Sequence, residues 1–135
     1  MAKEIKVFIV EDDSLMSDMY KNIFELSGYE VEMASDGIEA LEKLEKMDPL
    51  PVVMMLDIMM PKLNGLEVLE KMKNNEKFKK IPVVICLTNL AGKEDAEKAL
   101  ALGAVKYLVK SEYNPKEVVA KAKEAIDEYL EKNSS

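Results

Sequence analysis

Residues 52–65 read VVMMLDIMMPKLNG, so a single carboxylate, Asp57, lies inside an otherwise apolar run of nine residues, 52–60. A short run with so little polar alternation is typical of a strand that is covered on both faces of a sheet. A charged group in the middle of such a strand would be strongly destabilising. A carboxylate at the exit of the strand can instead reach a crevice and meet a cation. The stretch therefore predicts a buried strand over 52–56, with Asp57 just past its end.

Similar apolar runs recur along the chain, and between them lie stretches whose apolar residues have helical spacing. The connections are short, and right-handed crossovers then give an open, doubly wound parallel sheet. We predict a single α/β domain of the flavodoxin-like (βα)5 type, with strand order 2-1-3-4-5. The five predicted strands are residues 5–10, 29–34, 52–56, 81–87 and 105–109.

The first predicted helix covers residues 14–27. Its apolar residues, among them Leu15 and Leu26, are expected to form one broad inward face. Gly28 follows directly and suits a left-handed cap at the end of the helix.

The last predicted helix begins at Asn114, with Pro115 in its first turn and Glu117 three residues after the cap. This is a capping-box pattern. We expect the domain to cover residues 1–131, and residues 132–135 to form a frayed tail.

The overall composition limits the classes of function. The chain has 135 residues and a net charge of −7, which suits one domain with a real core and argues against direct binding to nucleic acid. No apolar stretch approaches the ~20 residues that span a bilayer, and the first residues do not resemble a signal peptide. The single cysteine, Cys86, rules out an internal disulfide and is interpreted as a buried strand residue. We therefore expect a cytoplasmic protein without membrane insertion.

All nineteen basic residues are lysine, because arginine and histidine are absent. The chain therefore has no histidine base, no histidine metal ligand and no phosphohistidine of its own. It also lacks the guanidinium fork that binds anions in a bidentate manner. Any phosphate group must be held by a metal ion, lysine, hydroxyl groups or the backbone.

Polar residues follow the predicted strands at the edge where ligands bind in doubly wound folds. The first strand is followed by Glu11, Asp12 and Asp13, the third by Asp57 and the fifth by Lys110. Clustered carboxylates repel one another, and a bound proton or metal ion relieves this repulsion. Oxygen ligands that are open to water favour Mg²⁺ over Zn²⁺.

An alternative explanation of the acidic residues 11–13 is an acidic helix start that the helix dipole stabilises. Taken alone, the two explanations are evenly balanced. Asp57, Thr88 and Lys110 at matching strand ends favour the metal site, although each of them alone would be unremarkable.

Four short motifs carry a resemblance to a known family. They are IVEDD (9–13), LDIMMPKLNG (56–65), CLTN (86–89) and YLVKS (107–111), of which the second matches the pattern D-x-x-M-P-x-x-N/D-G. In this order, at the ends of strands one, three, four and five, they resemble a response-regulator receiver domain of the single-domain, chemotaxis-protein type. The resemblance covers essentially the whole chain.

The resemblance implies that Asp57 is the nucleophile and becomes an aspartyl phosphate. Lys110 would pair with Asp57 and then with one phosphoryl oxygen, and the Thr88 hydroxyl with another. The chain would thus catalyse its own phosphotransfer and dephosphorylation, which leaves open whether it counts as an enzyme.

The resemblance also implies a Mg²⁺ site. Asp12 would be a direct ligand and Glu11 would act through a bound water. Asp57 and the backbone carbonyl of Met59 would complete the protein ligands. Asp13 is interpreted as a neighbour of the helix cap.

The family's switch maps onto Thr88 and onto Tyr107, which would swing inward after phosphorylation. Tyr107 can equally be a half-buried strand aromatic with its hydroxyl in water. Output would pass to a partner through the face formed by residues 92–131. The phosphoryl group would come from the phosphohistidine of a sensor kinase or a phosphotransfer protein, or from a small donor. Because the sequence shows no output domain, we expect docking to a downstream protein, as a monomer or as a phosphorylation-dependent dimer.

The sequence departs from the family pattern near the predicted site. Ser111 stands where the family usually has proline, which puts the geometry of the Lys110–Ser111 peptide in question. Asn89 replaces a small residue. Met59 and Leu90 add apolar bulk near the expected path of hydrolytic water, so we predict slow self-dephosphorylation.

Three alternative functions fit the sequence less well. A binding module that keeps the fold without being phosphorylated would not need the intact set of site residues. An aspartate-nucleophile phosphatase would need a second acid two residues after Asp57, where Met59 stands. A flavin or dinucleotide binder would need a glycine-rich loop after the first strand, where the chain is acidic.

Overall fold

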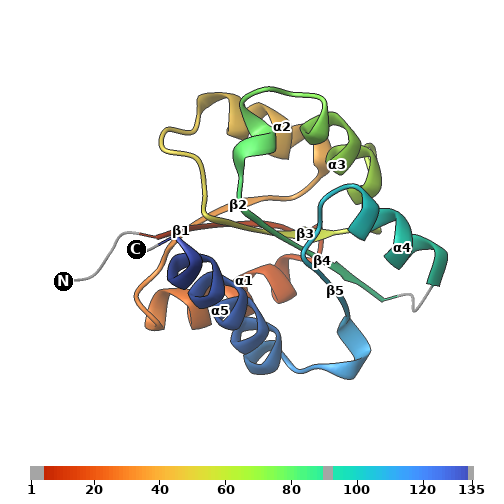
Figure 1. Cartoon of the computed structure of the whole chain (residues 1–135). Coiled ribbons are helices and arrows are strands. Elements are labelled where there is room, and N and C mark those ends of the chain that lie inside the picture. Colours follow the sequence, from red (N-terminus) through yellow and green to blue (C-terminus); the bar gives the residue numbers. More distant parts are fainter. Residues whose placement is uncertain (1–4, 90–92, 134–135) are drawn as a thin grey trace.

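The computed structural model describes residues 5–89 and 93–133, and in this part of the chain five parallel strands form one sheet (Figure 1). The strand order is β2-β1-β3-β4-β5, which confirms the predicted fold and topology. Consecutive βα units wind in both directions from the centre of the sheet, as in other doubly wound folds. The strands are β1 (Lys6–Val10), β2 (Glu30–Ala34), β3 (Val53–Asp57), β4 (Val83–Thr88) and β5 (Lys106–Val109).

Helices cover both faces of the sheet (Figure 1). Two of them, α1 and α5, lie on one face, and α2, α3 and α4 lie on the other. Short 3₁₀ turns precede β4 and follow β5. The helices are α1 (Ser14–Leu26), α2 (Gly37–Lys46), α3 (Gly65–Lys73), α4 (Lys93–Ala101) and α5 (Pro115–Lys132), and the turns are η1 (Phe78–Lys80) and η2 (Lys110–Glu112).

The three central strands β1, β3 and β4 are buried over their whole length. Successive side chains point to opposite faces, so Phe8 and Met54 pack toward α2 and α3, whereas Ile9 and Met55 pack toward α1 and α5. Burial on both faces explains the lack of polar alternation in these segments. Cys86 lies in β4 and is fully buried, as predicted.

The observed β3 differs slightly from the predicted strand. It includes Asp57 as its last residue, which pairs in register with Leu87 of β4. The carboxylate is therefore carried by a backbone that is hydrogen-bonded in the sheet.

The predicted inward face of α1 was wrong in two positions. Leu15 is 68% exposed and Leu26 is 89% exposed. The buried residues of α1 are Ser17, Tyr20 and Phe24. Each leucine lies two residues from this stripe, about 200° around the helix, and therefore points away from the sheet.

The predicted helix ends are confirmed. Asn114 and Glu117 form a capping box at the start of α5, and α5 continues to Lys132. Gly28 follows α1 with φ of +94°, a conformation that favours glycine. None of the helices in the described ranges is both long enough and apolar enough to cross a bilayer.

Candidate functional site

The carboxyl ends of β1, β3 and β5 bring three charged side chains together. Glu11 follows β1, Asp57 ends β3 and Lys110 follows β5. The Lys110 ammonium nitrogen lies 3.0 Å from Asp57 Oδ2 and 2.6 Å from Glu11 Oε1. One cation therefore bridges two carboxylates that lie on neighbouring strands.

This arrangement is almost completely removed from water. The exposed fractions of the Lys110, Glu11 and Asp57 side chains are 8%, 1% and 3%. Removing Lys110 would leave two buried carboxylates without a compensating charge, which is strongly destabilising. The two carboxylates therefore depend on Lys110 in the resting protein.

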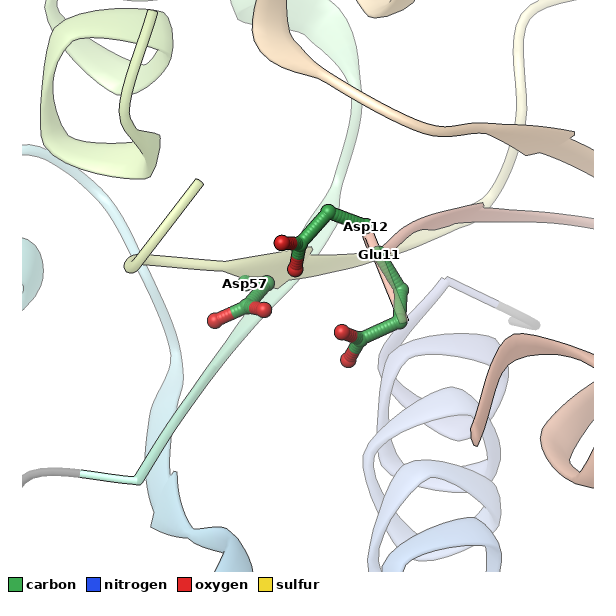
Figure 2. A group of neighbouring side chains, drawn as sticks. All are labelled: Glu11, Asp12 and Asp57. Carbon is green, nitrogen blue, oxygen red and sulfur yellow. The ribbon is translucent and has the colours of Figure 1, made fainter. Parts of the chain in front are cut away.

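Asp12 adds a third carboxylate on the solvent side. Carboxylate oxygens of Glu11, Asp12 and Asp57 all lie within 4.8 Å of one another. Figure 2 shows the three groups extending from two adjacent strand ends into a shared space. An all-oxygen set with one exposed member suits Mg²⁺, which retains several of its waters. These residues therefore fit the metal ion that the sequence predicts.

The pKa values of the group reflect burial first and charge second. Burial raises the pKa of Glu11 to about 7, although the hydrogen bond and the charge of Lys110 oppose this shift. Burial also raises the pKa of Asp57, again against the charge of Lys110. Burial alone would lower the pKa of Lys110, but the two carboxylates outweigh it and hold this pKa above its ordinary value. Lys110 thus stays charged, while the paired carboxylates favour an additional cation.

The loop after β3 fixes the orientation of the Asp57 carboxylate. The Met59 backbone N–H donates to Asp57 Oδ1 at 3.1 Å. The Gly65 N–H donates to the Ile58 carbonyl at 3.0 Å, which closes the loop onto the start of α3. A Cβ at Gly65 would meet the Asp57 carbonyl oxygen at 2.5 Å, so only glycine allows this approach.

Asp13 has a structural role beside the cluster. It is the N-cap of α1, where its carboxylate accepts hydrogen bonds from the N–H groups of Leu15 and Met16. Its own N–H donates to Glu11 Oε2 at 3.1 Å. The turn that starts α1 therefore also holds the Glu11 carboxylate.

Thr88 and Tyr107 lie on β4 and β5, the two strands that follow the Asp57 strand β3 in the sheet. Thr88 is buried at the end of β4, and Tyr107 is half-buried on β5 and packs against the core on the side of α2 and α3. Burial raises the pKa of Tyr107, and a side-chain hydrogen bond with Thr88 opposes this shift. The structure thus links the two residues for which the sequence predicts a switch.

A cleft of about 450 Å³ opens over the acidic cluster. The departures Met59, Asn89 and Ser111 all line it. Leu90, the other predicted apolar flank, lies outside the described residues. Among the described residues the cis peptide is Asp48–Pro49, so the Lys110–Ser111 bond is trans and its residues enter the short turn η2.

Two features of the site were missed by the sequence reasoning. The direct Glu11–Lys110 ion pair was not predicted, because strand order alone does not say which carboxylate the lysine reaches. Tyr20 was also missed. It sits on the buried stripe of α1, where an aromatic side chain looks like ordinary core, yet the charges of the site act on its hydroxyl.

The sequence model of the family described as response regulator receiver domain matches residues 7–132 of the chain. The chain belongs to the response-regulator receiver family. It is 36% identical to the chemotaxis protein CheY1 of Helicobacter pylori over 107 residues, which are 78% of this chain and 85% of that protein. It is 37% identical over 118 residues to the CpxR homolog of Haemophilus influenzae, covering 87% of this chain. The receiver spans only 48% of that transcriptional regulator.

Solved receiver structures have the same fold. The CheY-like receiver domain protein of Methanospirillum hungatei superimposes with a TM-score of 0.82 and 33% identity, covering 96% of this chain and 99% of that one. The receiver is therefore homologous to phosphorylation-activated response regulators, in which Mg²⁺ generally takes part and which interact with kinases or phosphotransfer proteins and with downstream targets.

Proposed function

We propose that the receiver accepts a phosphoryl group on Asp57 and thereby switches its affinity for a partner protein. The observation that carries this proposal is the Lys110 bridge between Asp57 and Glu11, with Asp12 beside it in the cleft. The arrangement provides a nucleophile, a cation for the transferred group and a place for a second cation. Such positioning and charge stabilisation account for most phosphoryl-transfer catalysis.

In the proposed reaction, a carboxylate oxygen of Asp57 attacks the phosphorus of a phosphohistidine on a partner. The new O–P bond forms as the P–N bond breaks, and the imidazole leaves with the bonding electron pair. The Lys110 ammonium then pairs with one phosphoryl oxygen, and the Thr88 hydroxyl donates a hydrogen bond to another. Because this chain has no histidine, the phosphoryl group comes from another protein or from a small donor.

We assign the Mg²⁺ ligands to Asp12, Asp57 and the Met59 carbonyl, with Glu11 acting through a water. Mg²⁺ bound there would neutralise charge on the phosphoryl oxygens. The exposure of Asp12 supports its role as a direct ligand, whereas Glu11 is committed to Lys110 in the resting protein.

We further propose that Thr88 turns toward the phosphoryl group and that Tyr107 follows it inward. The output face would comprise α4, β5 and α5, within residues 92–131, and it would bind a downstream protein.

Docking as a monomer or as a phosphorylation-dependent dimer fits this scheme. A cytoplasmic location, together with the kinase domains, fits it as well. We place the domain at residues 1–131 and the tail at 132–135, of which Lys132 is still the last residue of α5. The family match over 7–132 supports a boundary in this region.

The alternative is a receiver that binds partners without being phosphorylated. Such a module would gain nothing from a buried lysine that bridges two carboxylates, because burying these charges is costly. The geometry therefore favours the phosphorylated switch.

Intact-mass analysis after incubation with Mg²⁺ and acetyl phosphate tests the proposal. We expect one added phosphoryl mass, lost in Asp57→Asn and in EDTA. Asp13→Asn is the matched control, because it changes a neighbouring carboxylate but keeps a capping oxygen for α1. Labelling of Asp57→Asn at the wild-type level would contradict the assignment of the acceptor.

A further inference from the structure

The hydroxyl of Tyr20 is buried without a hydrogen-bond partner in the part of the chain that the structure describes. Tyr20 is fully buried in the middle of α1, in the core layer that α1 and α5 form with the sheet. A buried hydroxyl without a partner is costly, and phenylalanine would fill the same space without that cost. The hydroxyl therefore calls for an explanation other than packing.

The position of Tyr20 on α1 suggests an explanation for its buried hydroxyl. Side chains on a helix lean toward its N-terminus, and α1 begins three residues after Glu11, beside the acidic cluster. The charges of Lys110, Glu11 and Asp57 all act on the Tyr20 hydroxyl. Burial is the main reason that the pKa of Tyr20 is raised to about 12, so the hydroxyl keeps its proton and remains a donor. Tyr20 thus carries a buried, neutral donor on which the charges of the site act.

An acceptor lies in the same region. Glu11 Oε1 is also buried, and its close contact is with the Lys110 ammonium nitrogen at 2.6 Å. When Lys110 turns to a phosphoryl group on Asp57, this oxygen loses its cation. A carboxylate left unpaired in a buried site is strongly disfavoured.

We propose that Tyr20 is a positioning residue of the phosphorylated state, in which its hydroxyl donates a hydrogen bond to Glu11 Oε1 after Lys110 has turned away. The inference rests on the proposed function. The bond keeps Glu11 ionised and oriented toward the metal site. Because the hydroxyl is unpaired in the resting state and paired in the phosphorylated state, Tyr20 shifts the equilibrium between the two states toward the latter.

Tyr20→Phe tests this assignment, with Tyr29→Phe as the matched control. Tyr29 is half-buried, packs edge-on against Phe24 and lies outside the site. Two quantities are compared with the wild type: the melting temperature in EDTA, and the affinity for beryllofluoride in Mg²⁺ by titration calorimetry. Beryllofluoride binds an aspartate as a phosphoryl mimic.

We expect Tyr20→Phe to melt in EDTA at or above the wild-type temperature, because it removes an unpaired hydroxyl. Its affinity for beryllofluoride should fall about ten-fold or more, as for the loss of a hydrogen bond to a buried charged group. Tyr29→Phe should keep the wild-type affinity.

A lower melting temperature of Tyr20→Phe in EDTA would show that the hydroxyl is already bonded at rest and would overturn the inference. Wild-type affinity for beryllofluoride would overturn it as well. Labelling of the wild type by acetyl phosphate distinguishes a failure of the proposed function from a failure of the role of Tyr20. If the wild type is not labelled, the proposed function fails; if it is labelled and Tyr20→Phe binds normally, only the role of Tyr20 fails.

Discussion

Lys110 and Glu11 form a buried ion pair in which Lys110 Nζ lies 2.6 Å from Glu11 Oε1, and the side chains are 8% and 1% exposed. This contact is shorter than the one from Lys110 to the proposed phosphoacceptor Asp57. In the resting protein Lys110 is therefore held between two carboxylates. A phosphoryl group on Asp57 would compete with the carboxylates for Lys110, and a bound metal ion would compete with Lys110 for the carboxylates. Both effects can be measured as changes in stability.

Replacing the lysine should destabilise the metal-free protein and strengthen its response to Mg²⁺. In Lys110→Met two buried carboxylates lose their cation, and we expect the free energy of unfolding at pH 8 to fall by about 3 kcal/mol. Mg²⁺ should then raise the stability of the variant more than that of the wild type, because it replaces the missing charge. Urea denaturation with EDTA or Mg²⁺ measures both effects.

Lys79→Met is the control for this change. Lys79 pairs with Glu76 at 3.0 Å on the surface, and such exposed pairs contribute little. Equal losses of stability in the two variants would contradict the coupling of Lys110 to the acidic cluster.

The stability of the metal-free protein should depend on pH through Glu11. Burial raises the pKa of Glu11 from 4.5 to about 7, so between these values the folded state binds more protons than the unfolded state. This contribution to the free energy of unfolding is fully present below pH 4.5 and is lost as the pH rises through 7. Glu11→Gln, which does not titrate, should lack it.

Denaturation of both proteins in EDTA at several pH values between 4.5 and 8 tests this expectation. The stability of the wild type relative to Glu11→Gln should decline across the window. Parallel curves would mean that Glu11 titrates alike in the folded and unfolded chain.

Gly65→Ala should damage both the fold and the site. Alanine normally stabilises a helix relative to glycine by up to about 1 kcal/mol. Here its Cβ would lie 2.5 Å from the Asp57 carbonyl oxygen and 2.8 Å from Ile58 Cα, so we expect a net loss of about 2 kcal/mol. Labelling by acetyl phosphate should also slow, because the loop that orients Asp57 is displaced.

Glu70→Ala, an exposed change on the same helix, should alter stability by less than about 0.5 kcal/mol and leave labelling unchanged. Normal stability of Gly65→Ala would show that the start of α3 can move without cost.

The phosphorylated protein should lose its phosphoryl group slowly. The Met59 side chain is 51% exposed and lines the cleft together with Asn89, so it lies where a hydrolytic water would approach Asp57. We expect the phosphoryl group to persist for minutes or longer, and Met59→Ala to shorten its half-life severalfold. A time course of intact mass after removal of the donor measures both; a half-life of seconds in the wild type would refute the prediction.

Much of the fold could be predicted from the sequence, because burial on both faces leaves a direct mark. The run around Asp57 lacks polar alternation, and β3 is indeed buried throughout. Helix ends were also readable, since capping at Asn114 depends on neighbouring residues alone. The inner face of α1 was not, because apolar residues outnumber the positions on the buried stripe and Leu15 and Leu26 remain exposed.

The order of acidic, hydroxyl and lysine residues along the chain was sufficient to indicate the site and its family. Chain order was enough because parallel strands bring their carboxyl ends to one edge of the sheet, whatever the details of side-chain packing. Only the tertiary structure decided that Lys110 pairs with Glu11 as well as Asp57, and that the Tyr20 hydroxyl is buried without a hydrogen-bond partner among the described residues. These contacts depend on distances between residues of separate strands and helices, which the packing of the whole core sets and no local pattern records.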